Sequence, residues 1–308
     1  MSAEKTPAET RRGVENQVSF KHQSEFSSLK INGERLWSRL GELGEIGSYM
    51  DERTAMQGVR RLALTDSEIE GRNLVVKWML DQNLTVTIDP IGNVYARRKG
   101  RDETLAPVMM GSHIDSVGTA GRFDGCLGVI GGLEVLATLD DNNVTTDRPL
   151  VVAFFTDEEG VRFGTDMLGS ATAVGRLPLE DALSLKDRDG VSVADELARH
   201  NQSGDAPWLF EEKPHAYVEC HIEQGPVLLT ENYQLGVVTG VQGISWWRIK
   251  IGGAAAHAGW GAPVEQAPAA VGWPPRSGPP DAPAAPIAAG AGEPGAPGSR
   301  GAACATPA

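Results

Sequence analysis

The chain has 308 residues, 41% of them hydrophobic, and a formal net charge of −13 at pH 7. This length allows one large domain or two ordinary ones, and the charge argues against nucleic acids and anionic membranes as partners, because their phosphates would be repelled. No apolar run is long enough to cross a bilayer and no secretory signal is visible, so we expect a cytoplasmic protein whose three cysteines are free thiols.

Polar residues without a pattern fill positions 1–30, which we expect to be a disordered tail. Apolar residues at helical spacing then predict helices over about 33–43 and 66–81, the second capped by Thr65 or Asp66. The next segment, NLTVTIDPIGNVYARRKG, contains two β-rich runs around an Asp-Pro-Ile-Gly turn signal. It therefore predicts a β-hairpin.

Three apolar runs follow, APVMMG, PLVVAFFT and AYVEC, and each is rich in residues that favour strands. Because they are almost uninterrupted, we expect strands that are buried on both faces of a sheet. The segment between the first two, GCLGVIGGLEVLATLDDN, has helical length and spacing. The sequence over 31–235 thus predicts an α/β domain with a central, mostly parallel sheet flanked by helices.

Two changes in composition follow this domain. A new β-rich stretch, GVVTGVQGISWWRIKIGG, begins at Gly236 and predicts the start of a second, smaller domain over 236–259. Residues 260–308 hold 11 of the 19 prolines and consist mainly of Ala, Pro and Gly, so they bury too little apolar surface to become ordered. We expect this segment to be disordered, either as a natural linker or tail or as residues foreign to the fold.

Histidine and acidic residues follow the predicted strands, where open α/β sheets bind their ligands. In MMGSHIDSVG, Asp115 is placed to accept the second ring proton of His113, as metal-bound imidazoles need, although a surface His–Asp pair has the same spacing. In GRFDGCLG, Asp124 lies between two glycines and ahead of a helix. It is either a ligand or the N-cap of that helix.

The other two segments are TDEEGVRFG and VECHIEQGPVLL. Three adjacent carboxylates, Asp157, Glu158 and Glu159, repel one another at the end of the most apolar strand unless a cation or solvent compensates. His221 follows the third strand and is either a ligand or a core histidine. Cys220 beside it would suit a soft zinc site, but no CxxC or second Cys-His element supports one.

Taken together, the four segments supply His, Asp, Glu and His, the nitrogen and oxygen donors that suit zinc, manganese and related ions. One carboxylate can bridge two metals, and a free Glu beside them would act as a general base. The combination predicts metal-assisted hydrolysis of an amide-like bond. A GxSxG serine elbow and the GxGxxG and Walker A nucleotide motifs are all missing from the sequence.

In order and spacing, GSHIDSV, GRFDG, TDEEGVRFG, HIEQGPVL, GVVTGVQG and AAHAG resemble the hydantoinase/carbamoylase family of amidohydrolases. This family includes N-carbamoyl-L-amino acid hydrolases, β-ureidopropionases and allantoate amidohydrolases, within the dinuclear-zinc superfamily of aminoacylase and carboxypeptidase G. The resemblance covers about residues 31–259. It implies a zinc-exopeptidase-like catalytic domain over 31–235 and the start of a small α+β lid or dimerisation domain over 236–259.

The resemblance implies two divalent metal ions, Zn²⁺ or Mn²⁺, Co²⁺ or Ni²⁺. His113 and His221 would bind one of them, Glu159 would bind the second, and Asp124 would bridge the two. The partners that it implies are a small ureido substrate and a second copy of the chain in a homodimer.

Four residues receive catalytic or substrate-binding roles by the same resemblance. Asp115 would support His113, and Glu158 would be the general base that acts on the bridging water. Gln224 would line the substrate pocket, and His257 would reach the partner subunit's active site and polarise the substrate carbonyl. These roles imply hydrolysis of the ureido C–N bond of N-carbamoyl-L-amino acids.

The chain departs from the family after AAHAG. Relatives continue with an Arg-rich helix and a last metal-binding histidine, whereas no histidine follows His257 here. We interpret 260–308 as frame-shifted or otherwise foreign, expect at most one tightly bound metal and little turnover, and do not carry the homodimer over to this chain. The alternatives are an allantoate amidohydrolase or β-ureidopropionase and, from another class, an inactive metal-binding fragment.

Overall fold

The computed structural model describes residues 28–241, and the predictions for 1–27 and for 242–308 lie outside these residues. The chain divides into two compact units, Met1–Gln224 and Gly225–Ala308. The described part of the second unit contains α8 (Val227–Thr230). The described part of the first unit contains, in chain order, α2 (Gly33–Glu45), β1 (Ser48–Asp51), β2 (Met56–Val59), α3 (Asp66–Asp81), β3 (Thr85–Ile88), β4 (Val94–Arg98), β5 (Val108–His113), α4 (Cys126–Asp141), β6 (Leu150–Phe155), α5 (Leu168–Ala173), α6 (Leu179–Ser184), α7 (Val193–His200) and β7 (Ala216–Val218).

A five-stranded sheet forms the centre of the first unit, in the order β3-β4-β6-β5-β7. Strand β5 pairs in parallel with β6 and with β7, while β4 pairs antiparallel with β3 and with β6. Four of these five strands therefore run in one direction, which confirms the predicted, mostly parallel sheet. The β3–β4 pair is the predicted hairpin, and β1 and β2 form a separate antiparallel pair.

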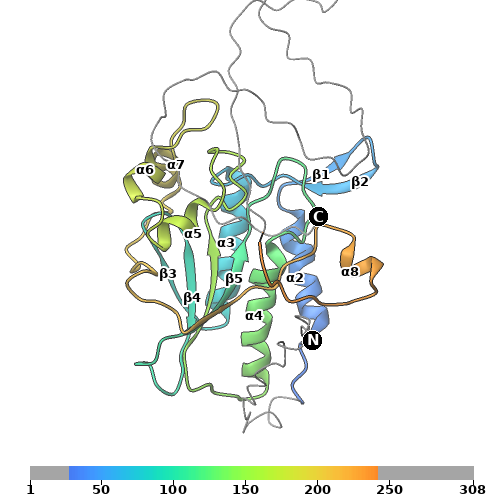
Figure 1. Ribbon diagram of the computed structural model, residues 1–308, viewed down its shortest axis with the longest axis vertical. Coiled ribbons are helices and arrows are strands. Elements are labelled where there is room, and N and C mark those ends of the chain that lie inside the picture. Colours follow the sequence, from blue (N-terminus) through green and yellow to red (C-terminus); the bar gives the residue numbers. More distant parts are fainter. Residues whose placement is uncertain (1–27, 242–308) are drawn as a thin grey trace, which may run out of the picture. The chain divides into compact units, whose positions relative to one another are not determined.

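Helices α2, α3 and α4 lie on one face of the sheet (Figure 1). The apolar side chains that join these helices to the sheet form the main core, which includes Leu43, Val75, Ile130, Leu133, Val152 and Phe154. The opposite face of the sheet buries a smaller cluster, Tyr95, Met109, Val151, Ala153, Phe155 and Ala206. Alternate residues of β6 thus serve both clusters, as a strand covered on both faces requires.

Strand β7 differs from this expectation. All six residues of β6 are buried, but all three residues of β7 are exposed. Strand β7 lies at the edge of the sheet, where it pairs with β5 alone among the strands within 28–241. The prediction of burial on both faces is therefore wrong for this strand.

Helix α3 carries a buried ion pair that connects it to the sheet. Nε of Arg72 donates to Glu68, one turn earlier, at 2.6 Å, and both side chains are 1% exposed. The same guanidinium donates to the backbone oxygen of Gly92 and to the hydroxyl of Thr156, and it lies over the ring of Phe154. The cation therefore fixes helix α3 to the end of β6.

Replacing Arg72 with Met is expected to lower the free energy of unfolding by about 3–5 kcal/mol, because the buried Glu68 carboxylate loses its partner. The matched control is Lys77→Met, which breaks an i,i+4 pair with Asp81 on the same helix. Both side chains of that pair are more than half exposed, so we expect a loss of at most about 1 kcal/mol. Urea unfolding of the two variants measures the difference, and equal losses would contradict it.

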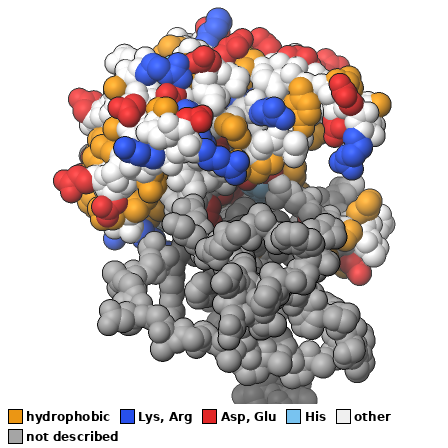
Figure 2. Space-filling view, turned by 90° about the horizontal axis from the view of Figure 1, so that it is seen from above, with side chains coloured by type: hydrophobic (Ala, Val, Ile, Leu, Met, Phe, Trp, Pro, Cys, Tyr) orange, Lys and Arg blue, Asp and Glu red, His pale blue; other side chains and the backbone are white. Residues whose placement is uncertain are grey.

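Within 28–241, none of the helices has the length and apolar character needed to span a membrane. On the face of the molecule shown in Figure 2, acidic and basic side chains are interspersed among polar and apolar ones. On that face, therefore, the acidic side chains do not form one continuous patch.

Candidate metal centre

Three parallel strands bring their carboxyl ends to one edge of the sheet. His113 is the last residue of β5, residues 157–159 follow β6 after Thr156, and His221 lies just beyond β7. Because β5 pairs with both β6 and β7, these segments are neighbours in space. Asp124 joins them from the loop that leads into α4, a helix that packs on β5. This edge thus collects the four polar segments that follow the apolar strands in the sequence.

The side chains of His113, Asp124 and His221 converge, and we call these three residues the trio. One candidate ligand atom from each lies within 4.8 Å of the other two. Nε2 of His221 is 3.3 Å from Oδ1 of Asp124, and Nε2 of His113 is 4.0 Å from the same oxygen. The two imidazole rings stack at 30° with their centres 6.0 Å apart. Two nitrogens and a carboxylate oxygen form a donor set that zinc and related cations accept.

Backbone carbonyl groups fix the tautomer of both histidines. Nδ1 of His113 lies 3.0 Å from the backbone oxygen of Asp115, and Nδ1 of His221 lies 2.9 Å from that of Ile222. Because a carbonyl oxygen only accepts, each neutral ring carries its proton on Nδ1 and donates it. In this neutral form each Nε2 keeps its lone pair on the side of Asp124, and it is the neutral form of the ring that binds a metal.

Asp115 is buried beside His113 and connects the ends of two strands. Its Oδ1 lies 3.5 Å from Nδ1 of His113. Its two carboxylate oxygens also accept hydrogen bonds from the backbone N–H groups of Glu158 and Glu159, each at 3.2 Å. The carboxylate therefore holds the segment after β6 against the segment after β5. It also fixes the backbone positions of Glu158 and Glu159.

Glu158 and Glu159 border the trio, and the pKa of each carboxyl is raised. Oε2 of Glu158 is 3.5 Å from Nε2 of His113. Burial raises the pKa of Glu158, with His113 opposing the shift and Asp115 adding to it. Burial likewise raises the pKa of Glu159 to about 7, with His113 opposing and Asp124 adding. A carboxyl group with a raised pKa accepts and returns a proton near neutral pH.

The negative charge of this region is incompletely balanced by the protein. Burial acts to lower the pKa of His113, but Asp115, Glu158 and Glu159 outweigh it and raise that pKa well above the usual value. Oε1 of Glu159 and Oδ2 of Asp157 are buried and have no hydrogen-bond partner among the residues described. A divalent cation would supply the positive charge that these groups lack, so the residues present fit one.

The remaining candidate residues have varied positions. Nε2 of Gln224 donates a hydrogen bond to Oδ2 of Asp124 and so orients that carboxylate. Glu159 is not part of the cluster of ligand atoms, although its charge interacts with that of Asp124. His257 lies outside the described residues. Helix α4 begins after Gly125 with no side-chain cap, so the alternative in which Asp124 is its N-cap is wrong.

Gly125 leaves room for the His113 ring. Its φ of +65° is one that residues with a side chain rarely adopt, and a Cβ there would lie 2.5 Å from two ring carbons of His113. We expect Gly125→Ala to displace the ring and weaken Co²⁺ binding by about 10- to 100-fold, the effect typical of disturbing a group that orients a ligand. Calorimetric titration of the purified variant with Co²⁺ measures it.

The control is Gly131→Ala in helix α4, where an added Cβ has nothing within 4 Å. This variant is expected to bind Co²⁺ like the parent chain and to gain about 0.5–1 kcal/mol of stability, because alanine favours the helix. If Gly125→Ala bound Co²⁺ as tightly as Gly131→Ala, the His113 ring would not need the space.

Sequence reasoning did not find the buried polar residues behind the centre. Oδ1 of Asn93 accepts from the backbone N–H of Thr156 at 2.9 Å, and its Nδ2 donates to Asp89 at 2.7 Å and to the backbone oxygen of Gly169 at 3.0 Å. Asn93 thus fixes the residue at which the acidic segment after β6 begins. Arg61 plays the corresponding part for β5, because it donates to the backbone oxygen of Ile114 just after that strand.

The sequence held one signal for the Asn93 contacts. It is the Asp-Pro turn, in which Asp89 accepts hydrogen bonds from two backbone N–H groups.

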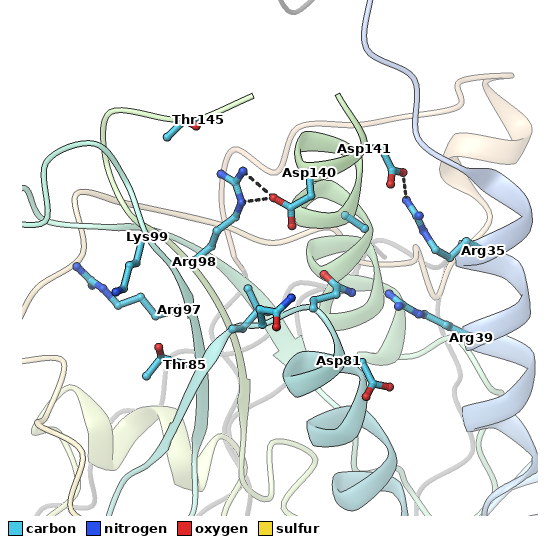
Figure 3. A pocket seen from close by; sticks show the side chains of 14 residues that line it. Arg35, Arg39, Asp81, Thr85, Arg97, Arg98, Lys99, Asp140, Asp141 and Thr145 are labelled. Carbon is cyan, nitrogen blue, oxygen red and sulfur yellow. Dashed lines mark hydrogen bonds and ion pairs between the residues drawn. The ribbon is translucent and has the colours of Figure 1, made fainter. Parts of the chain in front are cut away.

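A cavity of about 580 Å³ lies between α2, the ends of α3 and α4, and strands β3 and β4, and none of the candidate site residues lines it. Figure 3 shows Arg35 paired with Asp141 and Arg98 paired with Asp140 along its wall. Both acids lie in the last turn of helix α4, which contains no basic residue. Arginines from other elements thus offset the negative end of this helix, so the charged side chains that line the cavity have a structural role.

Comparisons with known proteins identify the family of the chain. The model of peptidase family M20/M25/M40 matches residues 109–293, which is more than half of the chain. The N-carbamoyl-L-amino-acid amidohydrolase of Rhizobium meliloti is 42% identical over 230 residues, which cover 75% of this chain and 54% of that relative. A protein of Oryza sativa subsp. japonica named "Probable allantoate deiminase" is 40% identical over 230 residues, which cover 72% of this chain and 45% of the relative.

Solved structures give the same answer. A hydantoinase/carbamoylase family amidase from Burkholderia ambifaria superposes with a TM-score of 0.65 at 46% identity, over 69% of this chain and 50% of the amidase. The chain spans about half the length of the curated relatives that it matches. The resemblance to the hydantoinase/carbamoylase amidohydrolases is therefore confirmed, and the chain belongs to peptidase family M20/M25/M40.

Proposed function

We propose that this chain carries the metal site and the general base of an amidohydrolase that cleaves the ureido C–N bond of N-carbamoyl-L-amino acids. The observation that supports this most is the convergence of the trio beside the carboxyl group of Glu158. Two relatives named for N-carbamoyl-L-amino acid hydrolysis are each 42% identical to this chain over the aligned residues. Because the chain spans about half of their length, its own activity and substrate are part of the proposal.

The trio would hold one divalent cation, Zn²⁺ or one of Mn²⁺, Co²⁺ and Ni²⁺. A second cation would be held by Asp124 and Glu159, with fewer ligands from this chain and therefore less tightly. A bound cation polarises a carbonyl oxygen and makes water a stronger nucleophile at neutral pH. We propose that each chain binds at most one cation tightly.

Glu158 would move the proton. Its carboxylate takes a proton from water as the water oxygen bonds to the ureido carbonyl carbon, and it returns that proton to the leaving nitrogen as the C–N bond breaks. The raised pKa of Glu158 suits both steps. This cleavage gives the amino acid and carbamic acid, and the carbamic acid then breaks down to carbon dioxide and ammonia. Gln224 and His257 would contact the substrate, and His257 would polarise its carbonyl group.

Allantoate is the second candidate substrate, because a relative named "Probable allantoate deiminase" is 40% identical to this chain over the aligned residues. N-Carbamoyl-β-alanine, the substrate of the β-ureidopropionases, differs from the first candidates in that its carboxylate is one carbon farther from the ureido nitrogen and it carries no side chain. All three substrates present a ureido carbonyl to the same groups. Only a direct comparison of rates therefore separates them.

The experiment loads the purified chain with Zn²⁺, Mn²⁺, Co²⁺ or Ni²⁺, measures the metal content, and assays the same sample on the three substrates. Metal-dependent release of the amino acid from N-carbamoyl-L-amino acids supports the proposal. Faster turnover of allantoate or N-carbamoyl-β-alanine would reassign the substrate class. One bound cation without turnover would identify an inactive metal-binding chain, and two tightly bound cations would contradict the asymmetry proposed above.

A further inference from the structure

We propose that Arg61 is a positioning residue that holds two metal-ligand segments in register through one buried guanidinium group. The inference rests on the proposed metal site, and it concerns a residue that touches neither a cation nor a substrate in that proposal. Arg61 is 1% exposed and lies between β2 and α3. It is one of the largest fully buried side chains of the described chain.

The guanidinium makes four hydrogen bonds. Nε donates to the backbone oxygen of Ile114 at 2.7 Å, and Nη2 donates to Sγ of Cys126 at 3.0 Å. Nη1 donates to the backbone oxygens of Leu43 and Ile46 at the end of α2, each at 2.9 Å. Since the guanidinium is planar and rigid, these partners are held at fixed distances from one another.

Two of these partners lie directly beside predicted ligands. Ile114 separates His113 from Asp115, and Cys126 opens helix α4 two residues after Asp124. One side chain therefore fixes the loop after β5 relative to the start of α4, and with it the distance between the first histidine and the aspartate of the trio. Groups behind the ligands of a metal commonly set its affinity in this way.

The backbone of Arg61 strengthens the same connection. Its N–H donates to Oγ of Ser116 at 2.8 Å, and its carbonyl accepts from the N–H of Ser116 at 2.9 Å. The loop after β5 is thus attached to Arg61 at Ile114 and at Ser116. Helix α3 leaves room for the side chain, because a Cβ at Gly71 would lie 3.0 Å from Cδ of Arg61.

A purely structural role would predict a different pattern of contacts. The last turn of α2 contains no basic residue, so the two bonds from Nη1 to the end of α2 offset the negative end of that helix. That explanation does not account for the bonds to Ile114 and Cys126, which lie on the other side of the guanidinium's fork and belong to the ligand segments. A readout of the metal site therefore separates the two roles.

The test compares Arg61→Lys with Arg35→Lys in the full chain. Lysine keeps the charge at each position but loses the planar fork, and Arg35 is a suitable control because its fork joins α2 to Glu134 of α4 without contacting a ligand segment. The measurements are the affinity for Co²⁺, the visible absorption spectrum of the bound Co²⁺, and urea unfolding without metal. We expect Arg61→Lys to weaken Co²⁺ binding by about 10- to 100-fold and to change the spectrum. Arg35→Lys should lose stability and keep the affinity and spectrum of the parent chain.

Each outcome decides one point. If Arg61→Lys folds and binds Co²⁺ with the parent's affinity and spectrum, the positioning role is wrong while the metal site stands. If the parent chain itself does not bind Co²⁺, the proposed metal site is wrong and the inference falls with it. If Arg61→Lys does not fold, Cys126→Ala decides, because it keeps the arginine and removes the one bond to the start of α4. An unchanged Co²⁺ spectrum and affinity in Cys126→Ala would then overturn the proposal, and a weaker affinity would support it.

Discussion

Replacing Asp124 with Asn is expected to weaken the binding of Co²⁺ by about 100- to 1000-fold. Asparagine has the same shape, but it lacks the negative charge that a cation needs from this position. The size follows from the binding free energy of structural zinc sites, about 10–16 kcal/mol, shared among about four ligands. The loss of one ligand then costs about 2.5–4 kcal/mol. Calorimetric or spectroscopic titration of the purified variant with Co²⁺ gives the value.

The fold should survive this change, because an asparagine oxygen still accepts the hydrogen bond that Gln224 donates to Asp124. Asp141→Asn is the matched control. Asp141 ends helix α4, is 55% exposed and pairs with Arg35, so its loss should leave Co²⁺ binding unchanged. An Asp124→Asn variant that is folded by circular dichroism and still binds Co²⁺ like the control would show that Asp124 is not a ligand.

Much of the fold and the gathering of the site could be predicted because both depend on local sequence signals. Helix α3 was predicted at its observed bounds, and β5, β6 and α4 follow from continuous apolar runs and helical spacing. Once three parallel strands are assigned, their carboxyl ends meet, and the residues that follow each strand must be neighbours. The pairing of β5 with β6 and β7 is therefore sufficient to explain why His113 and His221 lie close together.

The parts that escaped prediction depend on contacts between distant positions. Asn93 binds Thr156, and Arg61 binds Ile114 and Cys126, across more than 50 residues of sequence in each case. An isolated arginine or asparagine gives no periodicity, and on average such residues are exposed. Their burial becomes visible only when the strands and helices are assembled around them. The same is true of β7, whose exposure follows from its place at the edge of the sheet.

Glu158→Gln is expected to lower the turnover of N-carbamoyl-L-amino acids by about 100- to 10,000-fold, the usual contribution of a general base. Glutamine fills the same space beside His113, but it cannot take a proton from water. Because the trio of His113, Asp124 and His221 is untouched, we expect the affinity for Co²⁺ to change by less than about tenfold. Steady-state rates and Co²⁺ titrations of the same preparation measure both quantities.

A nearby carboxylate provides the control. Glu219 lies close enough to Glu158 for their charges to interact, but its two oxygens already accept hydrogen bonds from Ser112 at 2.6 Å and from Tyr217 at 2.9 Å. It is therefore held by its neighbours and is not free to act on water, so Glu219→Gln should keep turnover within about tenfold of the parent, as for other groups outside the reaction.

The loss of turnover in Glu158→Gln, compared with its loss of Co²⁺ affinity, assigns the role of this residue. A large loss of turnover with Co²⁺ binding retained is the signature of a base. A loss of Co²⁺ affinity as large as that of Asp124→Asn would instead make Glu158 a ligand. The proton transfer would then fall to Glu159, whose pKa of about 7 would allow it. If Glu158→Gln turned over substrate as fast as Glu219→Gln, Glu158 would not be the general base. The base would then be unassigned.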